Sequence, residues 1–220
     1  MKTINTNQDI PDYFYVFLEF NGVFDKINEH NYNLNHKISS SGMATLLDKT
    51  KTFDFINGDI DYLPFVRARE TNNSPSSFMM KIINEYNIEH NLEWCRRNYF
   101  KTYPSRFSGI FAFGDYHSCE LVAKKYSSWN IQSVKKYRLV DLGELNIGIK
   151  VAKLNMEIVS LLRGVNILSF SIEDQNQIYN HYWRGNGNLQ VYAPMTSQQN
   201  VQSEIIFEYL IEGILEEVPM

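Results

Sequence analysis

An apolar run late in the 220-residue sequence, IIFEYLI at residues 205–211, places the strongest constraint on how this chain folds. Its β-branched and aromatic residues favour a β-strand, and a strand with so much apolar surface is costly to leave exposed. We therefore predict a strand over Glu204–Val218 that lies in the middle of a sheet and is turned or broken near Glu212-Gly213.

The other predicted elements mix strands and helices without a regular alternation. Short apolar, aromatic and β-branched runs predict strands at Tyr13–Phe20, Ile110–Phe113 and Lys136–Leu142. Helical spacing and capping signals predict helices from Ser74-Pro75 to Tyr86, over Glu89–Phe100, from the cap Asp115 to Tyr126, over Lys153–Arg163 and over Ile172–Trp183. No glycine-rich loop follows a predicted strand, so a Rossmann or P-loop site is disfavoured and the predicted class is α+β.

The size and charge of the chain narrow its organisation and its partners. A length of 220 residues suits one large domain, which would span residues 1–220. Within it, residues 25–75 are polar and rich in Asn, Ser and Asp, and we expect irregular loops and short strands there. The formal net charge of -4 supplies no broad positive field, so a general nucleic-acid-binding surface is not expected.

The sequence also limits the compartment and the metal chemistry. No apolar run approaches the roughly 20 residues that cross a bilayer, and the N-terminal segment lacks the apolar centre of a signal peptide. We therefore expect a cytoplasmic protein with no membrane partner. Cys95 and Cys119 have no CxxC partner and are expected to be free thiols, while His117 and Cys119 alone do not make a metal site.

Two segments of the chain resemble the ADP-ribosyltransferase-like superfamily. The first is EWCRRNYFKTYPSRFSGIFAF at residues 93–113, in which an arginine-bearing helix leads through Pro-Ser-Arg into a short strand, as in an uncharacterised bacterial family of that fold. The second is HYWRG at residues 181–185, followed after a loop by EIIFEYLIEGILEEV, which is similar to the superfamily's closing strand. The resemblance covers roughly the C-terminal half of the chain, and residues 1–70 match no family that we can name.

This resemblance implies a fold, a substrate and a reaction. The expected fold is an ADP-ribosyltransferase-like split antiparallel β core with flanking helices and a cleft that holds NAD. The expected activity is transfer of ADP-ribose to an unknown protein or nucleic-acid acceptor. The superfamily places an Arg or His on its first strand, whereas Tyr13–Phe20 contains neither, so Arg106 or Arg67 would have to supply that cation from elsewhere.

A late-strand glutamate is the superfamily's catalytic signature, and Glu208 in FEYLIEG fits it best, with Glu204 as a rival. Residues an even number apart on a strand share a face, so Glu204 and Glu208 would both point into one cleft. A carboxylate there would hold a ribose hydroxyl and stabilise the positive charge of an oxocarbenium-like transition state. The alternative for Glu208 is a solvent-facing residue of an edge strand.

The Pro-Ser-Arg segment supplies candidate phosphate ligands. The guanidinium of Arg106 matches phosphate oxygens and could hold the pyrophosphate of NAD, or it could form a structural salt bridge to Glu93 or Asp115. Ser105 and Ser108 flank Arg106 and could donate to phosphate, although for Ser108 we favour a turn.

Three residues of HYWRG are candidates for binding the cofactor. Tyr182 and Trp183 could stack on nicotinamide or adenine, although a core position is the favoured interpretation for Trp183. His181 could act as a base or phosphate donor, but an isolated histidine near a helix end is more often a local hydrogen bonder.

Other interpretations stay open. The spacing of Glu93 from Arg96 and Arg97 predicts an ion pair on one helical face, and the resemblance adds Arg97 as a cleft residue. The chain could also be a catalytically silent binding or interaction module of the same fold, because its first strand lacks Arg and His. A third possibility is a phosphotransferase acting on NAD and a phosphorylated RNA, which the acidic balance disfavours.

Overall fold

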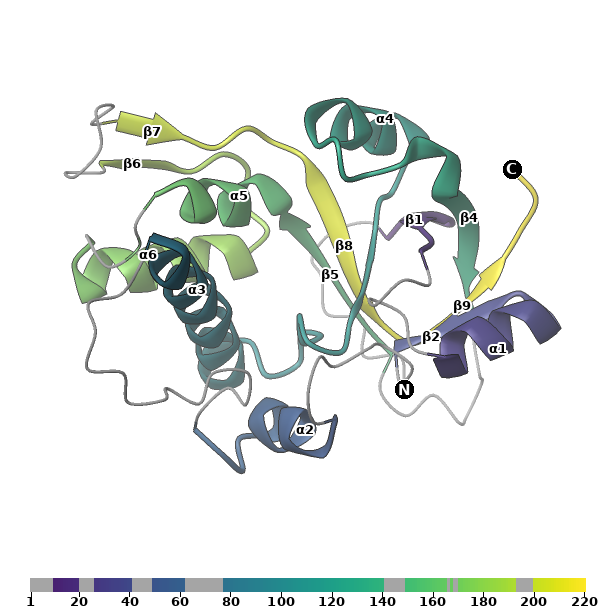
Figure 1. Ribbon diagram of the computed structural model, residues 1–220, viewed down its shortest axis with the longest axis horizontal. Helices are drawn as coiled ribbons and strands as arrows, with labels where there is room; N and C mark the ends of the chain where they lie inside the picture. The colour runs from purple at the N-terminus through teal and green to yellow at the C-terminus, as the bar shows by residue number, and fades with distance from the viewer. Residues whose placement is uncertain are drawn as a thin grey trace. The chain divides into compact units, whose positions relative to one another are not determined.

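The computed structural model describes residues 10–19, 26–40, 49–61, 77–140, 149–165, 167, 170–192 and 200–220. The chain divides into two compact units, and each unit is assembled from separated segments of sequence (Figure 1). The first unit consists of residues 1–46, 102–154 and 206–220, and the second of residues 47–101 and 155–205. One domain over residues 1–220 stays a prediction. The proposed helix start at Ser74-Pro75 and the candidate Arg67 lie outside the described residues.

Two β-sheets form the frame of the first unit. A four-stranded sheet has the order β1-β4-β9-β2, and a three-stranded sheet has the order β3-β8-β5. The strands are β1 (Phe14–Phe17), β2 (Lys37–Ser39), β3 (Ile110–Ala112), β4 (Val134–Leu139), β5 (Lys150–Asn155), β8 (Phe207–Glu212) and β9 (Ile214–Glu217). The pairs β1/β4, β4/β9, β2/β9 and β3/β8 are all antiparallel. This arrangement confirms the α+β class at the level of mixed helices and antiparallel sheets.

The two sheets of this unit meet at one reciprocal pair of backbone hydrogen bonds. The Tyr15 N–H donates to the Phe113 carbonyl at 2.8 Å, and the Phe113 N–H donates back to Tyr15 at 2.8 Å. Inward-facing residues of both sheets then share one apolar core. This core includes Phe14, Val16, Ile38, Ile110, Ala112, Tyr137, Val151, Tyr209, Ile211 and Leu215. The predicted central position is confirmed for β8, and the predicted break of the last strand falls at Gly213 between β8 and β9.

Helix α1 (Lys26–Asn35) corrects part of the expectation of irregular loops and short strands over residues 25–75, whereas β2 is one of the short strands expected there. Asparagine is a poor helix former, so the Asn-rich segment gives little helical signal by itself. The helix is held by tertiary contacts instead. The fully buried Asn28 side chain donates to the Ser39 carbonyl and accepts from the Ser39 N–H, each at 2.9 Å, which fixes α1 to β2.

Helix α4 (Tyr116–Lys125) completes the described helices of the first unit, with a short 3₁₀ turn, η2 (Ile131–Ser133), after it. Asp115 is its N-cap as predicted, because a side-chain oxygen of Asp115 accepts from the Ser118 N–H at 2.7 Å.

The second unit is mainly helical. Its elements are α2 (Lys49–Asn57), α3 (Ser77–Tyr99), α5 (Met156–Gly164), α6 (Ile172–Trp183) and the antiparallel pair β6 (Gln190–Tyr192) and β7 (Asn200–Gln202). Helix α3 packs on α5 and α6, which lie close to it in Figure 1. The indole N–H of Trp183 donates to the Leu92 carbonyl at 2.8 Å and ties α6 to α3. The predicted bounds of α6 are confirmed, and α2 again replaces an expected loop.

Two predicted helix boundaries are wrong. The segments Glu89–Phe100 and Ser74-Pro75 to Tyr86 were separate in the sequence pattern, whereas α3 runs unbroken from Ser77 to Tyr99 because no Gly or Pro interrupts it. The helix predicted over Lys153–Arg163 begins only at Met156, since the Asn155 side chain caps the Glu157 N–H at 3.1 Å and the preceding residues form β5.

Candidate functional site

One face of β8 carries the candidate site. Residues two apart on a strand point the same way, so Glu208, Leu210 and Glu212 share this face. Tyr209 and Ile211 point to the other face, where they join the core of the first unit. Each residue of the first set contacts the loop at residues 104–109, which we call the Arg106 loop.

Arg106 and Glu208 form a buried ion pair. Arg106 Nη1 lies 3.7 Å from Glu208 Oε1, and the two side chains are only 8% and 6% exposed. The guanidinium carbon of Arg106 also lies 5.2 Å from the centre of the Phe111 ring, a cation–π arrangement. A buried ion pair is weak support for stability, because replacing both charges with apolar residues is often neutral or stabilising. The Arg106–Glu208 pair alone is therefore weak evidence that this contact stabilises the fold.

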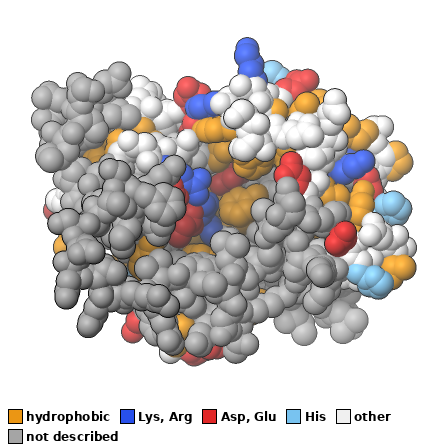
Figure 2. Space-filling view, viewed as in Figure 1, with side chains coloured by type: hydrophobic (Ala, Val, Ile, Leu, Met, Phe, Trp, Pro, Cys, Tyr) orange, Lys and Arg blue, Asp and Glu red, His pale blue; other side chains and the backbone are white. Residues whose placement is uncertain are grey.

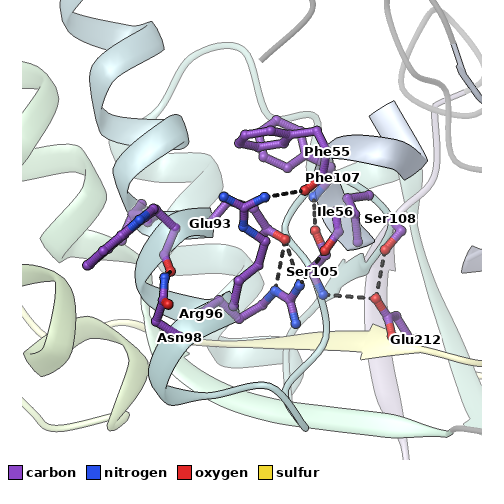
Figure 3. Close-up of polar contacts among 12 residues, drawn as sticks. Phe55, Ile56, Glu93, Arg96, Asn98, Ser105, Phe107, Ser108 and Glu212 are labelled. Atoms are coloured by element: carbon purple, nitrogen blue, oxygen red, sulfur yellow. Dashed lines mark hydrogen bonds and ion pairs between the residues drawn. The ribbon is translucent and has the colours of Figure 1, made fainter. Parts of the chain in front are cut away.

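Glu212 fastens the Arg106 loop to the far end of β8 (Figure 3). Its Oε1 accepts from the Ser105 N–H at 2.9 Å and from the Ser108 hydroxyl at 2.7 Å. Its Oε2 lies 2.8 Å from Nζ of Lys150 on the neighbouring strand β5. Sequence reasoning missed Glu212 and Lys150. The even spacing of Glu208 and Glu212 along one strand was the signal that could have found Glu212.

The two serines beside Arg106 have different roles. The Ser105 hydroxyl accepts from the Phe107 N–H at 3.1 Å, which is turn chemistry, and the residue is fully buried. Ser108 closes the same turn through its backbone and also donates its hydroxyl to Glu212, so the turn interpretation for Ser108 was incomplete. The expected phosphate role of Ser105 stays a prediction.

The two carboxylates considered as structural partners of Arg106, Glu93 and Asp115, each have a partner within their own unit, and a salt bridge from Arg106 to either of them stays a prediction. Glu93 accepts from Nε and Nη2 of Arg96 at 2.9 and 2.7 Å, and both side chains are buried within the second unit. Asp115 caps α4 in the first unit. The predicted helical ion pair is thus confirmed for Glu93 and Arg96.

Arg97, by contrast, ties α3 to the end of α2. Its Nη1 donates to the carbonyls of Phe55 and Ile60 at 2.9 and 3.3 Å, and its guanidinium lies over the Phe55 ring. These contacts within the second unit make Arg97 a connector between helices, and a cleft role for it stays a prediction.

The expectation that Glu204 shares a strand with Glu208 is wrong. Strand β8 begins at Phe207, and Glu204 lies before it as an exposed residue of the second unit. The cause is a tertiary contact, because the Asn155 side chain donates to the Glu204 carbonyl at 2.9 Å and to the Gly187 carbonyl at 3.0 Å. These bonds hold the backbone at Glu204 to the second unit.

The candidates from HYWRG belong to the second unit. Tyr182 and Trp183 have no exposed surface and pack against each other with ring centres 5.1 Å apart, so the core interpretation of Trp183 is confirmed. A stacking role for Tyr182 stays a prediction. His181 makes a local contact, with Nε2 3.1 Å from the Asn188 carbonyl oxygen. It also lines a shallow depression of about 930 Å³ together with Tyr99 and Arg184.

The cysteines are free, as predicted, and both are buried. Burial raises the pKa of both Cys95 and Cys119 to about 12, with Asp115 and Glu120 adding to the effect at Cys119. A thiol that stays protonated is a poor nucleophile. Among the residues that the structure describes, His, Cys, Asp and Glu side chains form no cluster of three suited to a metal ion.

The described part of one face of the molecule carries side chains of both charges (Figure 2). On the face shown in Figure 2, basic and acidic side chains are interspersed among polar and apolar ones. Within the described ranges, every helix is too short or too polar to traverse a lipid bilayer.

Two comparisons with known proteins found no match to this chain. A scan against protein-family models matches no family, and a search of curated proteins finds no match. The superfamily resemblance therefore rests on the sequence motifs alone.

Proposed function

We propose that the first unit is an ADP-ribosyltransferase-like domain that binds NAD and transfers ADP-ribose to a protein or nucleic-acid acceptor. The observation that carries the proposal is the pairing of Arg106 with Glu208 on the central strand β8. The motif PSRFSG and the motif FEYLIEG were matched to the superfamily separately, and their residues Arg106 and Glu208 lie 102 positions apart in the sequence. Their meeting in one buried pair supports a common site.

In this proposal Glu208 acts on the ribose. The bond between the nicotinamide nitrogen and the ribose carbon breaks, nicotinamide leaves with the bonding electrons, and a nucleophile of the acceptor bonds to that carbon and loses its proton to water. The Glu208 carboxylate accepts a hydrogen bond from a ribose hydroxyl and stabilises the positive charge that develops on the sugar. Arg106 binds the pyrophosphate of NAD, because a guanidinium has five N–H donors and can donate to a phosphate while it also contacts Glu208.

A silent binding module of the same fold is the second candidate. Two observations favour it: β1 carries no Arg or His, and Arg106 and Glu208 already neutralise each other where both are more than 90% buried. In such a module the Arg106–Glu208 pair would fix the Arg106 loop to β8, and the protein would not turn over NAD.

Glu208→Gln separates the two candidates, since glutamine keeps the shape of the side chain and removes its charge. NAD binding is measured by calorimetry and turnover by release of nicotinamide from labelled NAD. For an enzyme, turnover falls by roughly two to three powers of ten, the usual loss of a key electrostatic group, while NAD binding changes much less. The matched control is Glu204→Gln, at an exposed position outside β8, which leaves turnover unchanged.

Two results would contradict the proposal. Equal turnover in the wild-type protein and Glu208→Gln removes Glu208 from the mechanism. Undetectable NAD binding by the wild-type protein favours the silent module.

A further inference from the structure

We propose that Glu212 is a positioning residue, which holds the Arg106 loop so that Arg106 stands beside Glu208. The inference rests on the proposed function for its consequence in NAD binding, but its structural part stands on the geometry of the first unit alone. Glu212 lies four residues after Glu208, about 13 Å further along an extended strand. It therefore acts through the loop rather than on the same ligand atoms as Glu208.

The loop is fastened on both sides of Arg106 by one carboxylate oxygen. Ser105 precedes Arg106 and donates its N–H to Glu212 Oε1 at 2.9 Å, and Ser108 follows and donates its hydroxyl to the same oxygen at 2.7 Å. Backbone bonds from Ser108 and Gly109 to the Ser105 carbonyl, at 3.3 and 2.7 Å, close the turn between them. Arg106 thus projects from a closed turn whose two ends have a common anchor.

The anchor itself is oriented by its neighbours. Lys150 Nζ lies 2.8 Å from Glu212 Oε2, so the carboxylate presents its other oxygen to the loop. A carboxylate suits this position because it only accepts hydrogen bonds, and every group that faces Glu212 in these contacts is a donor. A glutamine would turn its NH₂ group toward either Lys150 or the loop, and one donor would then face another.

A third contact fixes the loop against the strand. Gly109 packs directly against Leu210, which lies between Glu208 and Glu212 on the same face of β8. The loop is therefore held at three successive positions of that face, and the contact nearest the proposed chemistry is the one made by Arg106.

This role predicts a division of kinetic effects. Loosening the loop weakens the hold on the pyrophosphate, which both the ground state and the transition state need, so KM rises more than kcat falls. Glu208→Gln has the opposite signature, with kcat falling and KM little changed. A residue that only stabilises the fold would lower the amount of active protein without changing KM.

The test compares Glu212→Ala with the control Glu216→Ala, which removes a partly exposed carboxylate from β9, the next strand along the chain and a member of the other sheet. The first readout needs no ligand: amide hydrogen exchange at Ser108 and Gly109, and the NMR signal of the Arg106 Nε–H. In Glu212→Ala, exchange at these amides is expected to accelerate at least about tenfold, the effect of losing hydrogen bonds to a charged group. In Glu216→Ala it stays at the wild-type rate.

The second readout is titration with NAD. Glu212→Ala is expected to bind NAD about tenfold more weakly, with Glu212→Gln between it and the wild type. If Glu212→Ala does not fold, Ser108→Ala and Lys150→Met replace it, since each removes one partner and leaves the carboxylate in place. Intermediate loosening of the loop in these variants supports the role.

Loop exchange that stays at the wild-type rate in Glu212→Ala, or in both replacement variants, overturns the positioning role. If the loop loosens as expected but the wild-type protein binds no NAD, the positioning role holds and the proposed function alone fails.

Discussion

Gly109 and Leu210 touch so closely that no side chain fits between them. A Cβ atom at Gly109 would lie 2.5 Å from Leu210 Cδ1 and 2.9 Å from the Ser105 carbonyl oxygen. Leu210 is fully buried in the middle strand of its sheet, and the carbonyl belongs to the backbone, so neither can move aside cheaply.

Gly109→Ala is therefore expected to destabilise the first unit by about 1–3 kcal/mol, the usual cost of overpacking a buried site. The measurement is the midpoint of thermal unfolding. The control is Gly164→Ala at the end of α5, where an added Cβ meets nothing within 4 Å and should leave the midpoint equal or slightly raised. An unchanged midpoint in Gly109→Ala would show that the loop does not pack against β8 in this way.

The two cysteines are expected to resist thiol reagents in the folded protein. Burial raises the pKa of Cys95 and Cys119 to about 12, so neither is a thiolate at about pH 8, where such reagents are used. A chromogenic disulfide reagent should therefore label neither in the native protein and both after unfolding in guanidinium. Rapid labelling of one thiol in the native state would contradict the burial of that residue.

A surface ion pair gives a pH dependence of known sign. Hydrogen bonds from Arg138, followed by Lys37, hold the pKa of Glu216 below its ordinary value of 4.5. A carboxyl whose pKa is lower in the folded state stabilises that state above the ordinary pKa, and this contribution is lost as pH falls through the lowered value. Arg138→Gln should therefore unfold at a lower temperature than the wild type at neutral pH. This gap, the difference between the two unfolding temperatures, should close as the pH falls below about 4.5.

The Arg138–Glu216 pair is exposed at the arginine, so the gap is expected to be small and to shrink in high salt. Glu216→Gln is the matched control, because it removes the titrating group and should abolish the pH dependence of the gap. A gap that persists unchanged into acid would mean that Arg138 stabilises the fold in another way.

The elements that sequence patterns predicted well are those whose signal is local. The bounds of α6 follow from its helical spacing, the start of α4 from the Asp115 cap, and the break of the last strand from Gly213. The apolar run around Leu210 predicted the central position of β8, because such a strand needs cover on both faces.

The parts that failed depend on contacts distant in sequence. Helix α1 is rich in asparagine, which gives little helical signal. The burial of Asn28 is explained only by its two hydrogen bonds to the Ser39 backbone, which the sequence pattern does not show. Glu204 has a strand-like sequence context, but Asn155 binds its carbonyl from 49 residues away. The role of Glu212 was hidden for the same reason, since a lone glutamate at a strand end says nothing of a loop more than 100 residues earlier.

The order of the strands along the chain has a consequence for biosynthesis. Strand β8 lies between β3 and β5, and β9 lies between β4 and β2, yet both follow every other strand that the structure describes. Until β8 and β9 are synthesised, the strands that flank them have unpaired backbone edges, and such edges are templates for aggregation. Arg106 emerges about 100 residues before Glu208, so a nascent chain carries the cation of the proposed site long before its carboxylate. The first unit is thus completed only when both β8 and β9 have been synthesised, and a product truncated before β8 would lack the middle strand of the three-stranded sheet and one of the two inner strands of the four-stranded sheet.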